Sequence, residues 1–300
     1  MPSAPSPYSE LLSRIPVRRD EASVLGGRTA YWVYGRDDAP ITLVAVHGFR
    51  GEHHGLEPVV AHLGDVRVVM PDLPGFGETA PVPGRTHDLS TYAEWLREFV
   101  VAVAPDAVVV GHSFGSIVAS AAVARGLATP RLILINPIGA PALEGPRGIF
   151  TRLAVWYYAL GARLPRRLGE AVLRNRVIVR VMSLAMVKTR ERGLRRFVHA
   201  QHDTYFSRFA DRDVLRDAFV TSVSNDVRAF APDISQPTLL VAAVQDDITP
   251  IEAERRLQTL FADAELVEID GVGHLIHYEK PREAAGAIRR FLGLFAGDTR

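Results

Sequence analysis

A serine with a glycine two positions away on either side is the first feature of this sequence that could do chemistry. Gly111-His112-Ser113-Phe114-Gly115 follows the apolar run Ala107 to Val110 and precedes a stretch whose apolar residues have helical spacing. A Gly-x-Ser-x-Gly pattern places the serine on a sharp strand-to-helix turn, where its hydroxyl is exposed. The amides at the start of the helix favour negative charge there. The pattern therefore predicts that Ser113 attacks a carbonyl carbon.

A serine hydroxyl needs a general base near neutral pH, and the intrinsic pKa of histidine suits that role. Of the ten histidines, His274 is preferred because it follows the strand-like run Glu265 to Ile269 and precedes the last predicted helix. A loop at the carboxyl end of the last strand can bring an imidazole to the serine. His277 is the reserve candidate.

The base needs an acid that orients it, and this acid is expected between the serine and the histidine, at the end of another strand. Asp246 and Asp247 both follow the predicted strand Thr238 to Ala242. Either carboxylate could instead cap the helix that begins near Pro250. We favour Asp246 as the acid and Asp247 as the turn and cap residue.

The loop His47-Gly48-Phe49-Arg50-Gly51 is expected to supply a second backbone donor for an oxyanion, because it follows the first central parallel strand. The N–H groups of Phe49 and Phe114 form the predicted oxyanion hole. His47 is interpreted as a residue that braces the loop. Arg50 is a candidate for binding an anionic group of the substrate, with a solvated arginine as the alternative.

These groups must meet at one edge of a sheet, and the chain accordingly alternates short β-branched runs with longer helical segments. Most predicted strands are continuously apolar, as expected for strands buried on both faces. The predicted strands are Ile41 to Val46, Val66 to Met70, Ala107 to Val110, Arg131 to Ile135, Thr238 to Ala242 and Glu265 to Ile269. The covering helices are Leu89 to Val103, Phe114 to Arg125, Ile251 to Phe261 and Arg282 to Phe295. An edge hairpin is expected from Arg18 to Leu25 and from Arg28 to Tyr34, with Gly26-Gly27 as its turn.

The strand pattern stops between residues 139 and 232, where the chain becomes helical and rich in Arg, Leu and aromatic residues. We interpret this stretch as a helical lid inserted into an α/β core that is formed by residues 1–138 and 233–300. Trp156, Tyr157 and Met182 are candidates for lining an apolar substrate pocket. The alternative is that they pack the inserted helices against one another.

Composition limits the classes of partner. The 300 residues are 47% hydrophobic, which is enough for a full core, and the formal net charge is +1. This balance gives no global reason to expect nucleic acid or an anionic membrane as partner, although it does not exclude local patches. A small, mostly neutral substrate fits better.

The sequence also limits cofactors and location. There is no cysteine, and no metal-ligand spacing such as His-Glu-x-x-His, so no metal or organic cofactor is expected. No stretch is long and apolar enough to span a bilayer, and the first residues lack an apolar signal core. A cytoplasmic monomer or homodimer is therefore expected.

The motifs together resemble the lidded α/β-hydrolase superfamily, which includes esterases, meta-cleavage-product hydrolases, epoxide hydrolases and haloalkane dehalogenases. The resemblance implies an α/β-hydrolase fold with Ser113, His274 and Asp246 as catalytic residues. In the family pattern the acid stands four residues before a proline, which supports Asp246 over Asp247. The residues that carry the resemblance are His47 to Gly51, Asp72 to Gly77, Gly111 to Gly115, Asp246 with Pro250, and Gly273-His274.

Differences between this sequence and the motifs of the subfamilies narrow the range of expected reactions. Related dehalogenases and epoxide hydrolases have an aspartate in place of Ser113, so alkyl-enzyme chemistry is not expected. Meta-cleavage-product hydrolases usually have the motif Gly-Asn-Ser-x-Gly-Gly at this turn. This chain instead has His112 before the serine and Ser116 after the second glycine. The expected reaction is hydrolysis of a small or medium apolar carboxylic ester through an acyl-enzyme.

Two alternatives remain open. One is a carbon–carbon bond hydrolase of aromatic degradation, in which Arg152, Arg163 or Arg180 would bind a dienoate carboxylate. The other is a non-catalytic ligand-binding member of the fold, since a fold does not by itself establish activity.

Overall fold

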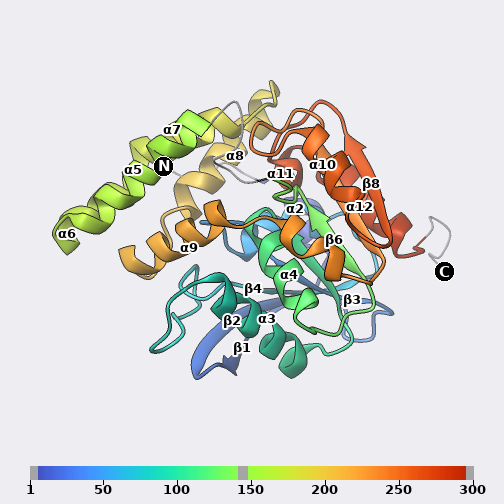
Figure 1. Cartoon of the computed structure of the whole chain (residues 1–300). Coiled ribbons are helices and arrows are strands. Elements are labelled where there is room, and N and C mark those ends of the chain that lie inside the picture. Colours follow the sequence, from blue (N-terminus) through green and yellow to red (C-terminus); the bar gives the residue numbers. More distant parts are fainter. Residues whose placement is uncertain (1–5, 141–147, 295–300) are drawn as a thin grey trace.

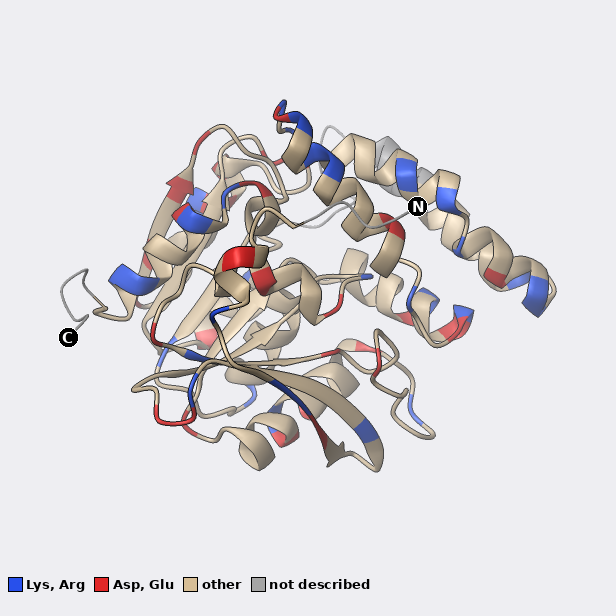
Figure 2. Cartoon of the chain, turned by 180° about the vertical axis from the view of Figure 1, so that it is seen from behind, with Lys and Arg blue, Asp and Glu red and all other residues tan. Residues whose placement is uncertain are grey.

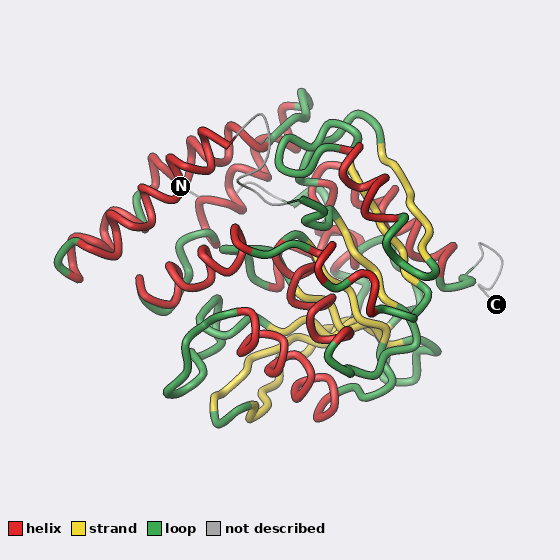
Figure 3. Tube along the Cα trace, viewed as in Figure 1, coloured by secondary structure: helices red, strands yellow, loops and turns green. Residues whose placement is uncertain are grey.

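The computed structural model describes residues 6–140 and 148–294, with side chains described from residue 154 onward after the gap. Eight strands form one sheet in the order β1-β2-β4-β3-β5-β6-β7-β8 (Figures 1 and 3). β1 pairs with β2 and β2 pairs with β4 in antiparallel orientation, and all other neighbouring strands are parallel. The carboxyl ends of six strands therefore meet at one edge. The strands are β1 Val17–Val24, β2 Gly27–Tyr34, β3 Thr42–Val46, β4 Arg67–Pro71, β5 Val108–His112, β6 Leu132–Ile135, β7 Thr238–Ala243 and β8 Ala264–Ile269.

Helices cover both faces of the sheet, which explains why the central strands are continuously apolar. One face packs against α3 Leu89–Val103, α4 Phe114–Ala124 and α10 Ile251–Gln258. The other packs against α2 Glu57–Val60 and α12 Pro281–Phe291, with the short α1 Ser9–Leu12 and α11 Ile276–Glu279 nearby. The α/β fold predicted from the sequence is confirmed.

The edge hairpin is present, but its turn differs from the prediction. Gly27 pairs with Val24 inside the ladder, so the turn residues are Leu25 and Gly26 rather than Gly26 and Gly27. Both turn residues have positive φ, 50° and 74°. This conformation matches the twist of two-residue hairpins, and it places a leucine where glycine or asparagine is more usual.

Between β6 and β7 the described chain forms helices and no strand. Figure 1 shows α5, α6 and α7 lying along one outer edge of the molecule, while α8 and α9 lie nearer to the sheet. Among the described residues, no helix combines the length and apolar character needed to cross a bilayer. The inserted helices are α5 Gly148–Arg163, α6 Arg166–Leu173, α7 Arg176–Met186, α8 Arg192–Tyr205 and α9 Arg212–Ser224.

Candidate active site

Ser113 stands on a strained turn between β5 and α4. Its φ of 51° and ψ of −117° are unusual for a residue with a side chain. The turn is tight because a Cβ on Gly111 would lie 2.4 Å from the Gly115 carbonyl oxygen, and one on Gly115 would lie 2.3 Å from the Val46 oxygen. Only glycine fits at both positions, so the spacing noted in the sequence is a steric requirement of this turn.

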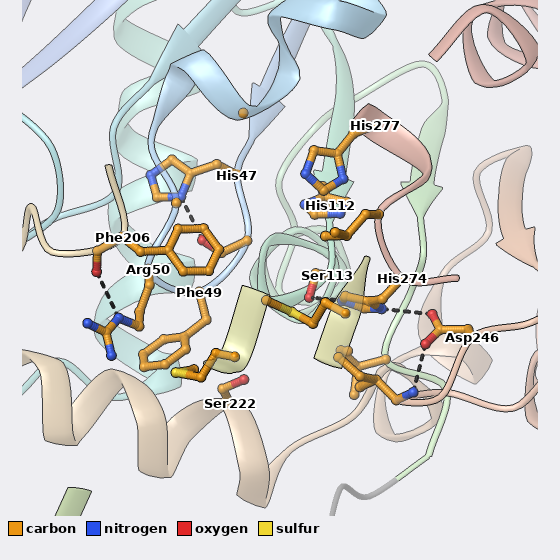
Figure 4. A pocket seen from close by; sticks show the side chains of 18 of the residues that line it. His47, Phe49, Arg50, His112, Ser113, Phe206, Ser222, Asp246, His274 and His277 are labelled. Carbon is orange, nitrogen blue, oxygen red and sulfur yellow. Dashed lines mark hydrogen bonds and ion pairs between the residues drawn. The ribbon is translucent and has the colours of Figure 1, made fainter. Parts of the chain in front are cut away.

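The Ser113 hydroxyl lies beside His274. Serine Oγ is 2.7 Å from His274 Nε2, and His274 Nδ1 is 2.7 Å from Asp246 Oδ2 (Figure 4). The three groups come from the carboxyl ends of β5, β7 and β8, and they form one chain of hydrogen bonds. All three residues are therefore brought together as the sequence predicted.

The carboxylate of Asp246 accepts four hydrogen bonds. Oδ1 accepts from the N–H groups of Ile248 and Thr249, and Oδ2 accepts from His274 and from the side-chain amide of Asn136 at 3.1 Å. Burial alone would raise the pKa of Asp246, but His274 and the two backbone amides hold this pKa below its ordinary value. The acid is thus kept ionised.

Asn136 was missed by the sequence reasoning. It follows β6, its φ is 44°, and its side chain reaches across to the end of β7. Asparagine tolerates this left-handed backbone better than most residues do. The available signal was its place directly after a predicted strand, which is where parallel sheets present functional side chains.

Asp247 does not cap α10 as predicted, because the N-cap residue of this helix is Pro250 and no side chain caps it. Asp246 itself accepts the turn amides, whereas the Asp247 carboxylate forms an ion pair with Lys188, between α7 and α8. The two neighbouring carboxylates therefore point in different directions, Asp246 to the histidine and Asp247 to the inserted helices.

The loop from His47 to Gly51 lies against Ser113, because a Cβ on Gly48 would be 3.2 Å from Ser113 Cβ. His47 Nδ1–H donates to the Gly48 carbonyl at 2.8 Å, and Nε2 accepts from the Leu73 amide at 2.9 Å. These bonds match the bracing role predicted for this histidine. In the part of the chain that the structure describes, the N–H groups of Phe49 and Phe114 donate to no other residue.

Arg50 points away from Ser113 and into the inserted helices (Figure 4). Its side chain is buried, and it donates to the carbonyl oxygens of Phe206 and Leu173 at 2.8 Å each and to the Tyr158 hydroxyl at 3.2 Å. Leu173 ends α6 and Phe206 follows α8, so the cation is placed at the negative ends of two helices. The alternative of a solvated arginine is wrong. Arg50 is among the residues that line the cavity beside Ser113, but the contacts of its guanidinium favour a positioning role over binding of a substrate anion.

A cavity of about 550 Å³ opens beside Ser113. Its apolar lining includes Ile138, Ala154, Met182, Met186, Phe219 and Val223. Met182 thus lies where the sequence predicted it. Trp156 and Tyr157 do not line the cavity: the Trp156 side chain is 71% exposed, and the Tyr157 hydroxyl donates to the carbonyl oxygens of Val172 and Leu173.

His277, the reserve base, is buried beside His112 with its ring centroid 4.0 Å away (Figure 4). Burial lowers the pKa of His277 well below its ordinary value and lowers that of His112 to about 3. His274 is the histidine whose nitrogen lies at the serine hydroxyl.

One group of side chains has the spacing of metal ligands. Atoms of Glu52, His53 and His54 lie within 4.8 Å of one another. However, His53 Nδ1 is bound to Asp72 Oδ1, and Glu52 Oε1 is bound to His54 Nδ1. Internal partners therefore occupy these three atoms, whereas Glu52 Oε2 is buried without a hydrogen-bond partner among the described residues. The expected lack of a metal stays a prediction.

This mostly parallel sheet, with an antiparallel edge hairpin and a serine turn after β5, is the arrangement of α/β hydrolases. A model of the alpha/beta hydrolase family matches residues 43–287, which is most of the chain. The protein therefore belongs to that family and is a hydrolase, as the sequence motifs predicted.

Two sequence relatives and one solved structure align with three quarters or more of this chain. The uncharacterized hydrolase YugF of Bacillus subtilis (strain 168) is 25% identical over 289 residues, 92% of this chain and 98% of that protein. The 2-hydroxy-6-oxo-2,4-heptadienoate hydrolase of Pseudomonas putida is 27% identical over 229 residues, 75% of this chain and 78% of that protein. A thermophilic esterase from Thermogutta terrifontis has a TM-score of 0.71 at 22% identity, over 92% of this chain and 98% of that chain. The last similarity shows the fold alone.

Proposed function

We propose that this hydrolase cleaves a small or medium apolar carboxylic ester through an acyl-enzyme on Ser113. The observation that carries the proposal is the hydrogen-bonded chain from Ser113 Oγ through His274 to Asp246. An apolar cavity at the serine favours an apolar substrate.

In the proposed cycle, His274 Nε2 takes the proton of Ser113 as Oγ attacks the ester carbonyl carbon. The free N–H groups of Phe49 and Phe114 hold the oxyanion, and His274 then gives the proton to the leaving alcohol. Water, deprotonated by the same imidazole, releases the acid and restores the serine. Asp246 orients the imidazole and stabilises its charged form.

We propose further that residues 139–232 act as a lid over an α/β core of residues 1–138 and 233–300. In support, Ala154, Met182, Phe219 and Val223 from α5, α7 and α9 line the cavity. A lid of this kind shields the cavity from bulk solvent and selects the substrate. The cytoplasmic location and the monomeric or dimeric state stay predictions.

Cleavage of a carbon–carbon bond is the second candidate, because one relative is named as a heptadienoate hydrolase. The lid arginines suggested for its carboxylate do not support it. Arg163 is exposed, Arg180 pairs with Asp203, neither lines the cavity, and the Arg152 side chain lies outside the described residues. The ester reaction therefore has the stronger support.

The test is labelling by a fluorophosphonate probe together with turnover of p-nitrophenyl esters and of ring-cleavage dienoates. We expect one label per chain, ester turnover far above dienoate turnover, and loss of both label and turnover in Ser113→Ala. Ser222→Ala is the matched control, because Ser222 also lines the cavity but no histidine is hydrogen-bonded to it. Labelling that persists in Ser113→Ala, or dienoate turnover that exceeds ester turnover, would overturn the proposal.

A further inference from the structure

The inserted helices carry a local charge that the net charge of the chain conceals. Residues 148–200 contain twelve Lys and Arg against two Asp and Glu, whereas the rest of the chain contains 23 against 32. Figure 2 shows the basic residues recurring along the helices at the edge formed by α5 to α8. A nearly neutral protein therefore has one strongly cationic side.

The same helices expose large apolar side chains. Among the described residues, seven of the twelve exposed large hydrophobic side chains belong to α5, α6 and α7, with exposures from 37% to 71%. They are Val155, Trp156, Leu160, Leu168, Val177, Val181 and Leu184. Single exposed hydrophobic residues are ordinary, but a group on three successive helices is not.

These side chains form stripes rather than scattered points. Val177, Val181 and Leu184 have the i, i+4, i+7 spacing of one face of α7, and Val179 and Ser183 on the same helix are buried. Trp156 and Leu160 have the i, i+4 spacing on α5, whose Tyr158 is buried. Each helix thus has one face packed inside and a second, apolar face in solvent, which is expected only if something covers that second face.

We propose that the outer face of α5 to α7 binds the surface of an anionic lipid bilayer. In this arrangement Trp156, Val177 and Val181 enter the boundary between headgroups and acyl chains. The exposed cations Arg167 and Arg176 at the same helices lie among the lipid phosphates. The cavity beside Ser113, which is lined by residues of α5 and α7, would then open close to the lipid surface.

The charge and the apolar chemistry favour a lipid surface over other occupants. A second copy of this chain would bring the same cationic face against itself, which costs energy. Nucleic acid would match the charge, but among these seven exposed side chains only Trp156 offers an aromatic face on which a base can stack. This inference does not rest on the proposed reaction, because membrane binding does not require Ser113.

The experiment is sedimentation of the full chain with vesicles of phosphatidylcholine alone and of phosphatidylcholine containing phosphatidylglycerol. We expect pelleting with the anionic vesicles at roughly 50 mM salt, and binding weaker by about tenfold with neutral vesicles or at roughly 500 mM salt. Trp156→Ser/Val177→Ser/Val181→Ser and Arg167→Glu/Arg176→Glu should each weaken anionic-vesicle binding by about tenfold or more.

Matched controls lie on the other side of the molecule. Val101→Ser removes an exposed valine of α3, and Arg125→Glu reverses an exposed arginine after α4, and both should bind vesicles like the parent. Thermal melts verify that all variants are folded. No pelleting of the parent with anionic vesicles, binding by either multiple variant equal to that of the parent, or a dimer that the triple variant converts to monomer would each overturn the inference. Vesicle binding leaves the ester reaction untested, so the two proposals can fail separately.

Discussion

Asp246 and Asp247 have the same side chain and adjacent positions, but their carboxylates have different partners. Asp246 contacts His274, and Asp247 contacts Lys188 of the inserted segment. The first is buried, and the second is partly exposed to solvent. This pair therefore offers a comparison of two adjacent carboxylates that differ in partner and in burial.

We predict that Asp246→Asn lowers kcat for p-nitrophenyl esters by about 10³-fold or more, because the amide cannot hold the imidazole in the required tautomer and charge. Asp247→Asn should change kcat by less than about threefold, since it removes a partly exposed ion pair. Steady-state kinetics of both variants check this. A larger loss in Asp247→Asn than in Asp246→Asn would show that the acid is wrongly assigned.

Substitution of Asn136 is expected to lower kcat less than substitution of Asp246. We predict that Asn136→Gly lowers kcat by about tenfold, because Asp246 Oδ2 loses one charge-assisted hydrogen bond while glycine keeps the left-handed backbone. Asn136→Ala should lose additional stability, since alanine is strained at this φ. Kinetics and thermal melts separate the two effects. Unchanged kcat in Asn136→Gly would contradict a positioning role.

Arg50 connects the loop that carries Phe49 to three inserted helices, through Tyr158 of α5, Leu173 of α6 and Phe206 after α8. Arg174 has a related environment. It stacks on Phe209, as Arg50 does, and donates to the carbonyl oxygens of Ser207 and Phe209. Its partners all lie within the inserted segment, so Arg174 is a natural control.

We predict that Arg50→Gln lowers kcat by about tenfold or more, because the loop that presents the Phe49 amide is no longer fixed. Arg174→Gln should lose comparable thermal stability while kcat changes by less than about threefold. Melting temperatures and kcat measured on both variants separate the effect on stability from the effect on catalysis. Equal kcat in the two variants would mean that Arg50 has only a structural role.

Much of the core could be predicted from the sequence because its strands and turns obey local rules. The turn that carries Ser113 needs glycine at positions 111 and 115. The predicted apolar runs match the bounds of β3 to β8 within a residue or two. The side-chain environment of the inserted helices could not be predicted. An apolar residue such as Trp156 has the same helical spacing whether it lines the cavity or, as here, faces solvent.

The same limit applies to contacts between distant segments. Asn136 is 110 residues from Asp246, and Arg50 is 156 residues from Phe206. No local pattern specifies such partners. The charge of the chain as a whole was equally uninformative, because the excess of cations between residues 148 and 200 is balanced by acidic residues elsewhere.

Several buried histidines make the stability of the molecule depend on pH. Burial lowers the pKa of His112 and of His202 to about 3 and that of His277 well below its ordinary value. The unfolded chain binds protons at these histidines below about pH 6.5, whereas the folded chain does not. Each histidine therefore contributes stability that is present above about pH 6.5 and is lost as the pH falls toward the folded pKa.

We predict that the free energy of unfolding decreases between about pH 6.5 and pH 4.5, by up to about 1.4 kcal/mol per pH unit for each of these histidines. His202→Gln should make this dependence shallower. His54→Gln should act in a different pH range: burial lowers the pKa of His54, but the hydrogen bond to Glu52 raises it overall, so the stability from His54 is present below about pH 6.5 and is lost as the pH rises above that value. Urea unfolding at several pH values checks this, and an unchanged slope in His202→Gln would contradict it.

The proposed reaction requires that Ser113 forms a covalent acyl intermediate. Its most direct test is rapid acid quenching of the protein during turnover of a p-nitrophenyl ester, followed by mass mapping of its peptides. We expect an acyl group on the peptide that contains Ser113, up to one per chain. Turnover without any acylated peptide, or an acyl group on another residue, would contradict it.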